Sequence, residues 1–308
     1  MTRHPSLPTV PALAAALLLT SALCAPPPSA AGPVTRVLLV GDSWSEFMWI
    51  DRSMRDVFAA NGRPDIVEKG DETAISGSTA EEWAQPSELQ RITDELDANP
   101  TIDVVQLTIG GNDFLAGQPG GGWYAGIPPA ELEALYGRIV GDVTTVLDHV
   151  LAHDPDLTVV VSLYDHPNFV DSLGGLLAFL CVPKWNELGQ PTPEQINTAG
   201  MDLQERLTTL VASRPRTNIV DHTGLMQFVY GFPPDDPPGT LLPPGDLTRP
   251  SPIEAMRLQS DCFHLRADGN GVLAQNLWDS FYDGFFNGLL FRDGFESGST
   301  TAWSAAVP

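Results

Sequence analysis

The chain is short of basic residues. Only 16 of its 308 residues are Lys or Arg, against 39 Asp or Glu, which gives a formal net charge of −23. No run of basic residues occurs that could follow a phosphate backbone, so nucleic acid is not an expected partner. The same acidity favours solubility and repels strongly anionic surfaces.

Sequence motifs for metals and cofactors are also missing. The chain has no His-Glu-x-x-His, no Cys-x-x-Cys and no glycine-rich phosphate loop. We therefore expect no metal ion and no organic cofactor. Internal repeats are absent as well, and the length suits one large domain or two small ones.

Long hydrophobic runs are lacking too. The apolar run at 10–23 is too short for a comfortable membrane span. It follows Arg3 and His4 and precedes a stretch rich in Pro, Ser and Ala, a pattern typical of a secretory signal peptide. We predict a signal peptide over residues 1–31, a secreted or periplasmic location and no stable membrane span.

Cysteine is scarce, with three residues in the whole chain. Signal cleavage near Ala25 or after Ala31 would remove Cys24; the alternative, lipid attachment at Cys24, is disfavoured because Leu23 is a poor fit to the small residue such signals carry there. Cys181 and Cys262 would remain, and an even pair in an exported protein favours a disulfide. Two buried free thiols stay possible, because spacing alone does not establish pairing.

What the chain does have is a buried strand at 34–40 that runs directly into a small turn carrying Ser43. Open α/β sheets place their chemistry at the carboxyl ends of strands, so Ser43 is the candidate nucleophile. Gly, Asp and Ser are also ordinary turn formers, and on this stretch alone a plain strand-ending turn is equally plausible.

Two further turns share this pattern. The strand at 102–109 runs into a Gly-Gly-Asn-Asp turn, where the Asn112 amide can donate two hydrogen bonds without carrying charge. Gly77 lies in a polar turn at 74–79 that opens a helix, and a backbone N–H there could donate to an oxyanion. Each turn read alone is also explained by backbone flexibility.

Near the carboxyl terminus, Asp261 and His264 are three residues apart. This spacing lets the carboxylate fold back and orient the imidazole within a single turn. Two other histidines follow strands: His166 is a possible pocket residue, and we place His222 in a loop at the rim of the site. The apolar stretch 174–179 could line a substrate channel or form a core turn.

The remaining segments alternate between strands and helices, which predicts a parallel sheet covered on both faces. The proline-rich segment 232–252 has no periodicity and is either a lid or wall over the site or a disordered excursion. The expected strands are 65–69, 157–164 and 218–221, and the expected helices are 46–60, 131–153, 193–213 and 272–286.

Taken together, the blocks at 41–45, 75–77, 110–113 and 261–264 resemble the SGNH/GDSL hydrolase family in kind and in order. The resemblance covers 34–286. It implies a three-layer α/β/α sandwich with a five-stranded, parallel, flavodoxin-like sheet. We predict this hydrolase domain over residues 32–290, followed by a polar carboxyl-terminal tail over 291–308.

The resemblance also assigns roles to single residues. It makes Ser43 the nucleophile, His264 the base and Asp261 the carboxylate that orients it, and it forms the oxyanion hole from the N–H groups of Ser43 and Gly77 and the side chain of Asn112. The Gly-x-Ser-x-Gly pattern of the common lipase-type α/β-hydrolases is absent around Ser43.

The activity implied is that of an esterase or lipase acting on a small-molecule, lipid or acylated-sugar ester through an acyl-enzyme intermediate. A carbohydrate O-deacetylase or an acyltransferase would use the same residues. A non-catalytic binding module is a further alternative, although it would not need the whole set. Acyl chain length and oligomeric state are not encoded by these motifs.

Overall fold

The computed structural model describes residues 32–288, so the predicted signal peptide and the polar tail lie outside the described residues. Five strands form one parallel sheet in the order β2-β1-β3-β4-β5. The strands are β1 (Val34–Gly41), β2 (Ile66–Lys69), β3 (Val104–Thr108), β4 (Thr158–Ser162) and β5 (Thr217–Val220). This is the flavodoxin-like strand order, and the predicted fold class is confirmed.

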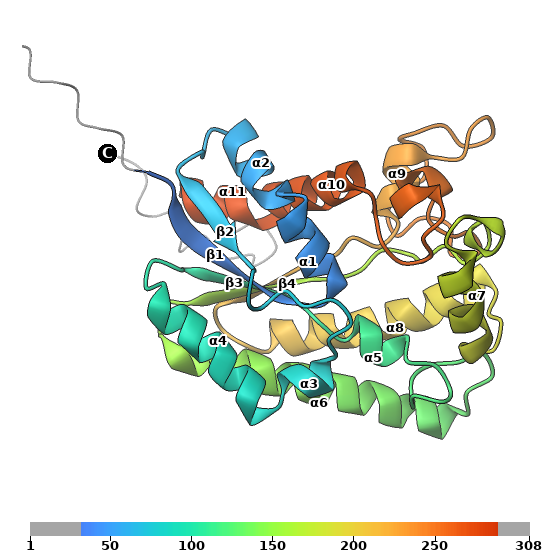
Figure 1. The fold of residues 1–308 in the computed structure, drawn as a ribbon, viewed down its shortest axis with the longest axis horizontal. Coiled ribbons are helices and arrows are strands. Elements are labelled where there is room, and N and C mark those ends of the chain that lie inside the picture. The colour runs from blue at the N-terminus through green and yellow to red at the C-terminus, as the bar shows by residue number, and fades with distance from the viewer. Residues whose placement is uncertain (1–31, 289–308) are drawn as a thin grey trace, which may run out of the picture. The chain divides into compact units, whose positions relative to one another are not determined.

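Helices cover both faces of the sheet (Figure 1). One layer contains α1 (Ser43–Ile50), α2 (Ser53–Ala60), α10 (Ala267–Leu277), the π-helical turn η4 (Trp278–Tyr282) and α11 (Asp283–Asn287). The other contains α3 (Ala80–Trp83), α4 (Pro86–Ala98), α5 (Gly111–Phe114), α6 (Pro129–His153) and α8 (Pro193–Ala212). Successive residues of β1 show why two layers are needed, because Val37 packs in one core and Leu38 in the other.

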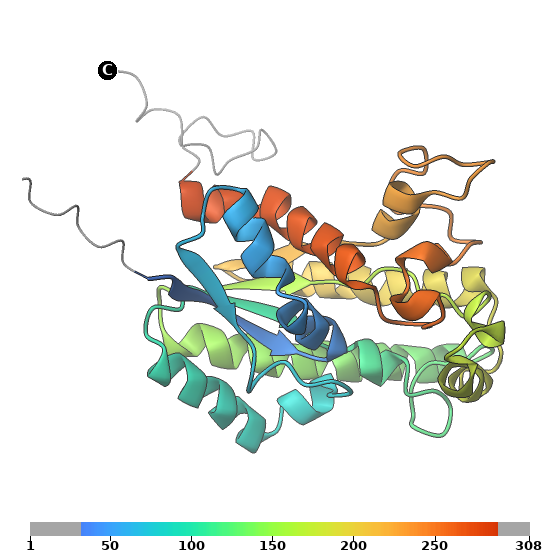
Figure 2. The same cartoon turned by 45° about the horizontal axis from the view of Figure 1, so that its top comes forward.

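The remaining helices lie beyond the carboxyl ends of the strands, as both ribbon views show (Figures 1 and 2). They are α7 (Ala178–Glu187), α9 (Leu225–Tyr230) and the short 3₁₀ turns η1 (Ser172–Gly174), η2 (Ile253–Ala255) and η3 (Arg257–Gln259). This end of the sheet is where chemistry is expected. No helix within residues 32–288 has the length and apolarity that a membrane crossing requires.

The prediction of one helix over 46–60 is wrong in two respects. The helical segment begins earlier, at Ser43, and it is divided at Arg52, whose backbone is left-handed with φ 60°. The break redirects the chain so that Met48 of α1 and Met54 of α2 both reach the core on the same face of the sheet.

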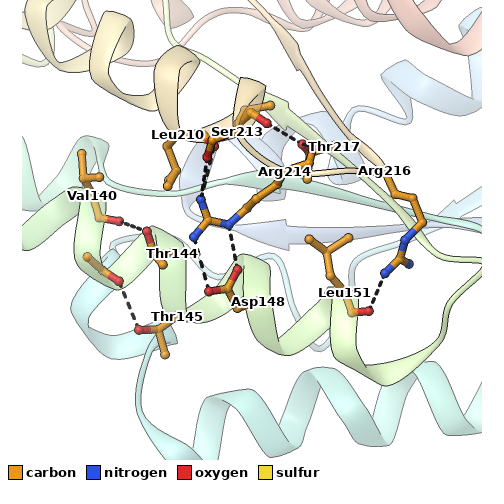
Figure 3. Close-up of polar contacts among 12 residues, drawn as sticks. Val140, Thr144, Thr145, Asp148, Leu151, Leu210, Ser213, Arg214, Arg216 and Thr217 are labelled. Atoms are coloured by element: carbon orange, nitrogen blue, oxygen red, sulfur yellow. Dashed lines mark hydrogen bonds and ion pairs between the residues drawn. The ribbon is translucent and has the colours of Figure 1, made fainter.

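The opposite end of the sheet is held by arginines (Figure 3). Arg214, just after α8, pairs with Asp148 of α6, with 2.7 Å between Nε and Oδ1. Arg216 donates to the backbone carbonyls of Leu151 and Leu157, at 2.8 Å each. These contacts join α6, α8 and the start of β5, and they leave the carboxyl ends of the strands free for a site.

Candidate active site

Ser43 lies at the junction of β1 and α1. The Asp42 side chain caps the helix by accepting from the Trp44 N–H at 2.9 Å, so Ser43 becomes the first helical residue and its own N–H has no partner within the helix. Gly41 is required before it: a Cβ there would meet the Thr108 carbonyl oxygen of β3 at 2.1 Å. The close approach of β1 and β3 therefore fixes where Ser43 points.

His264 and Asp261 complete a chain of hydrogen bonds to this serine. The distance from Ser43 Oγ to His264 Nε2 is 2.9 Å, and the distance from His264 Nδ1 to Asp261 Oδ2 is also 2.9 Å. In the neutral ring with its proton on Nδ1, the imidazole donates to the carboxylate and accepts from the hydroxyl. The structure thus brings together three residues that are up to 221 positions apart in sequence.

The turn from Asp261 to His264 is built around one carboxylate. Asp261 Oδ1 accepts from the backbone N–H groups of Phe263 at 2.8 Å and His264 at 3.0 Å. Burial opposes ionisation of Asp261, but the hydrogen bonds from His264 and from these backbone groups outweigh it and hold the pKa of the carboxyl below its usual value. The side chain beside the imidazole is therefore an anion at neutral pH.

A disulfide joins this turn to α7. Cys181 and Cys262 are bonded, with their Cα atoms 5.8 Å apart. Ser172 of η1 donates its hydroxyl to the Asp261 carbonyl at 2.8 Å. The turn that carries His264 is thus attached covalently and by hydrogen bonding to the η1–α7 segment.

Two other turns face the same cavity as Ser43. Gly77 adopts φ +82°, a conformation that favours glycine, in the turn before α3. Asn112, in α5, donates from Nδ2 to the Ser78 carbonyl at 2.9 Å, which fixes its amide and leaves a second N–H for a substrate oxygen. Asp113 accepts from the Ala80 N–H at 2.7 Å and so ties α5 to the start of α3.

Tyr164 connects the serine turn to the asparagine turn. Its hydroxyl donates to Asp42 Oδ2 at 2.6 Å and accepts from the Gly111 N–H at 3.1 Å. Burial raises the pKa of the Asp42 carboxyl to about 6, and the hydrogen bond from Tyr164 opposes that shift. Sequence reasoning missed this residue; its place at the end of the fourth strand was the available signal.

The site opens into a cavity of about 460 Å³. Its lining includes Ser43, Gly77, Asn112 and His264, which are the residues with predicted roles. The same cavity is lined by one face of α8, and most of the exposed lining is apolar. The helix predicted over 193–213 carried no expected role at the site, so its contact with the cavity was also missed.

The two additional histidines have different positions. His166 does line the cavity, but its Nε2 contacts the Pro244 carbonyl oxygen at 3.0 Å. The placement of His222 at the rim is wrong: it is fully buried, with Nε2 3.0 Å from Ser162 Oγ and Nδ1 2.9 Å from Asn276 Nδ2. Burial lowers the pKa of His222 to about 4.

The proline-rich segment 232–252 is ordered against the molecule, and none of its residues lines the main cavity. Side-chain amides hold its carbonyls: Asn197 donates to Leu247 and Arg249 at 3.0 and 2.8 Å, and Gln227 donates to Asp246 at 3.1 Å. It therefore packs against α8 and His166, and the expected alternatives, a lid or wall over the site and a disordered excursion, are both incorrect.

The stretch 174–179 does not match either of its expected roles. Leu176 and Phe179 are 74% and 68% exposed, and no residue of the stretch lines the main cavity. Within residues 32–288, no group of three or more His, Cys, Asp and Glu side chains is arranged to hold a metal ion.

Comparisons with known proteins bear on the family and on the fold. A family model for the GDSL-like Lipase/Acylhydrolase family matches residues 39–272. Comparison with curated proteins found no significant match.

Solved structures share the fold at low identity. A Streptococcus pneumonia protein named for platelet activating factor aligns with a TM-score of 0.50 and 14% identity, over 82% of this chain and 85% of that one. The lipase Lip_vut3 from a goat rumen metagenome aligns with a TM-score of 0.49 and 13% identity, over 81% of this chain and 98% of that one. The psychrotrophic esterase EstA from Pseudoalteromonas sp. aligns with a TM-score of 0.46 and 15% identity, over 82% of this chain and 98% of that one.

Proposed function

Because the chain belongs to the GDSL-like lipase/acylhydrolase family, we propose that it is a serine hydrolase that cleaves carboxylic esters through an acyl-enzyme intermediate. The observation that carries the proposal is the continuous hydrogen-bonded chain from Ser43 through His264 to Asp261. Such a chain is the arrangement that activates a weak nucleophile with an oriented base.

The steps follow from the positions of the atoms. His264 Nε2 accepts the Ser43 proton while Oγ attacks the ester carbonyl carbon, and the imidazolium that forms is stabilised by the adjacent Asp261 anion. The carbonyl oxygen becomes an anion facing the N–H groups of Ser43 and Gly77 and the Asn112 amide. His264 then protonates the leaving alcohol, and water repeats the sequence to release the acid.

These three donors are suited to that charge because they are neutral and already oriented. The Asn112 amide is held by the Ser78 carbonyl, and Ser43 and Gly77 offer backbone groups. Removal of one oxyanion donor typically costs about 2.7–4 kcal/mol of transition-state stabilisation. The proposal therefore places much of the rate enhancement in the turns after β1, before α3 and after β3.

We also propose that the protein is exported and functions as a single hydrolase domain over 32–290. Residues 1–31 resemble a signal peptide, and the bond between Cys181 and Cys262 is of a kind that persists in oxidising compartments. The substrate is a small-molecule, lipid or acylated-sugar ester. Secretion is tested by amino-terminal sequencing of the protein recovered from the medium of expressing cells, with cleavage at 25–31 expected.

The activity is tested with p-nitrophenyl acetate, butyrate and octanoate. Wild-type protein should hydrolyse at least one of them, and Ser43→Ala should lose at least about 1000-fold in kcat. Ser45→Ala is the matched control, since Ser45 is a neighbouring buried serine whose hydroxyl contacts the Val40 carbonyl at 3.4 Å. Equal loss in both variants, or full activity in Ser43→Ala, would contradict the proposal.

A further inference from the structure

One face of α8 lines the cavity next to the site. Four of the lining residues, Ile196, Gly200, Leu203 and Leu207, recur at the spacing of successive helical turns, so they form a single stripe along the helix. Phe114 to Ala116, which follow Asn112 in the chain, also line the cavity. Phe114 and Leu115 belong to the same apolar cluster as Ile196, Leu203 and Leu207, so the apolar lining includes both the segment after Asn112 and α8.

The charged groups of the cavity do not compete with this surface, because each has a partner. Asp42 accepts from Tyr164, and Asp165 accepts from the Gly224 and Met226 N–H groups at 2.7 Å each. Lys184 pairs with Glu187 at 2.5 Å. Two polar residues of α8, Asn197 and Gln204, also line the cavity, and their amides contact carbonyls of the proline-rich segment and the Thr223 hydroxyl. The apolar stripe beside them is suited to an uncharged aliphatic group.

The cavity is larger than the smallest esters require. At about 460 Å³ it falls within the range of sites that enclose drug-sized ligands. An acetyl group would occupy only a fraction of it and leave apolar atoms facing water. A longer chain would displace that water, and each buried methylene improves binding by about fourfold.

Gly200 provides the space in the middle of the stripe. It lies inside α8, where glycine normally weakens a helix, and a Cβ built there would have no heavy atom within 4 Å. Any side chain at this position would therefore extend into open space at the cavity. The absence of a side chain at Gly200 determines how much room the substrate has.

We propose that the α8 stripe binds the acyl chain of the ester and that Gly200 sets the chain length accepted. The inference rests on the proposed hydrolase function. The chain is assigned to the acyl side because the alcohol must lie against His264, which protonates it, whereas the stripe packs in one apolar cluster with Phe114 and Leu115, which follow the oxyanion donor Asn112. The preferred substrate is an ester of an unbranched acid of about six to ten carbons, sized by the cavity volume.

The test compares kcat/KM for p-nitrophenyl octanoate and acetate in wild type, Gly200→Ala and Gly200→Leu. We expect the octanoate-to-acetate ratio to fall about fourfold in Gly200→Ala, which adds one carbon, and roughly 250-fold in Gly200→Leu, which adds four carbons and so displaces about four methylenes. Gly141→Leu is the control: this glycine lies in α6, is exposed and is equally free of neighbours. Its ratio should stay at the wild-type value.

Two outcomes overturn the inference while leaving the hydrolase function intact: a ratio that does not change in Gly200→Leu, or a wild-type enzyme that cleaves acetate no less efficiently than octanoate. A dependence on alcohol length instead, measured with ethyl, butyl and octyl acetate, would also overturn it. Octanamide, which is uncharged, gives a readout independent of turnover. It should raise the melting temperature of wild type more than acetamide does, and Gly200→Leu should abolish that difference.

Discussion

Replacing Tyr164 with phenylalanine should weaken the protein in a pH-dependent way. The variant keeps the ring, which packs edge-on against Trp44 with centroids 5.3 Å apart, and removes only the hydroxyl. Asp42 then loses its 2.6 Å hydrogen bond, and the Gly111 N–H loses its acceptor. The Asp42 carboxyl and the Gly111 N–H both stay in the site, and no other group replaces the lost hydroxyl.

The magnitude follows from the state of Asp42. Because burial raises the pKa of this carboxyl from 3.8 to about 6, its contribution to stability is greatest below pH 3.8 and is lost as the pH rises through 6, a cost of about 3 kcal/mol. A hydrogen bond to the charged form is worth about 1.5–3 kcal/mol, and one to the neutral form about 1 kcal/mol. Tyr164→Phe should therefore destabilise by about 2–4 kcal/mol at pH 8 and by about 1–2 kcal/mol less at pH 5.

Urea unfolding of wild type and variant at the two pH values measures this difference. Tyr136→Phe is the control, because Tyr136 is buried and donates to a neutral acceptor, the Ala199 carbonyl, at 2.7 Å. Its cost should be the same at both pH values. At pH 8 the kcat of Tyr164→Phe should also fall about tenfold with KM little changed, because the turn that carries Asn112 loses its hydrogen bond at Gly111. Equal destabilisation at pH 5 and pH 8 with an unaltered kcat would refute the reasoning.

Three further outcomes are expected. Asn112→Ala should lower kcat by about 100- to 1000-fold with a much smaller change in KM, measured with the ester that wild type cleaves best; a loss confined to KM would argue against an oxyanion donor. The Cys181→Ser/Cys262→Ser variant should lose about 2–4 kcal/mol of stability. Its kcat should fall at temperatures where its circular dichroism spectrum is still native, because the disulfide holds the turn that carries His264. Unchanged activity would show that the turn needs no covalent support. Burial lowers the pKa of His222 from 6.5 to about 4, so wild type should lose about 3 kcal/mol of stability as the pH falls across that interval. His222→Gln should lose correspondingly less stability between pH 7 and pH 4, measured by unfolding. Equal losses in the two proteins would place the acid sensitivity elsewhere.

Much of the fold was predictable because buried parallel strands leave a strong local signal. The strand before Ser43 and the strand before Asn112 are short apolar runs followed by glycine, and both were located to within a few residues. The break at Arg52 was not predictable, since a positive φ at an arginine has no signature in the amino-acid pattern.

The site shows the same division. Ser43, Asn112 and His264 lie in recognisable blocks, whereas Tyr164 contributes through a hydroxyl whose partners come from two distant turns. Such contacts are set by how the strands pack side by side. The burial of His222 and the exposure of Phe179 were missed for a similar reason: local polarity does not say which surface another segment will cover.

The way in which the proline-rich segment is held has a consequence for sequence variation. Most of its contacts with Asn168, Asn197 and Gln227 are made by its backbone carbonyls, with distances of 2.7 Å from Asn168 to Ser251 and 2.8 Å from Asn197 to Arg249. One contact runs the other way, since the Asp246 N–H donates to Gln227 Oε1 at 2.7 Å. Every amino acid offers a carbonyl, and proline gives up only an N–H, which among these contacts is used at Asp246 alone. Most side chains in 232–252 can therefore vary among relatives while the three amides that bind the segment are kept. Gly245 is an exception, because a Cβ there would meet Gln227 Oε1 at 2.3 Å.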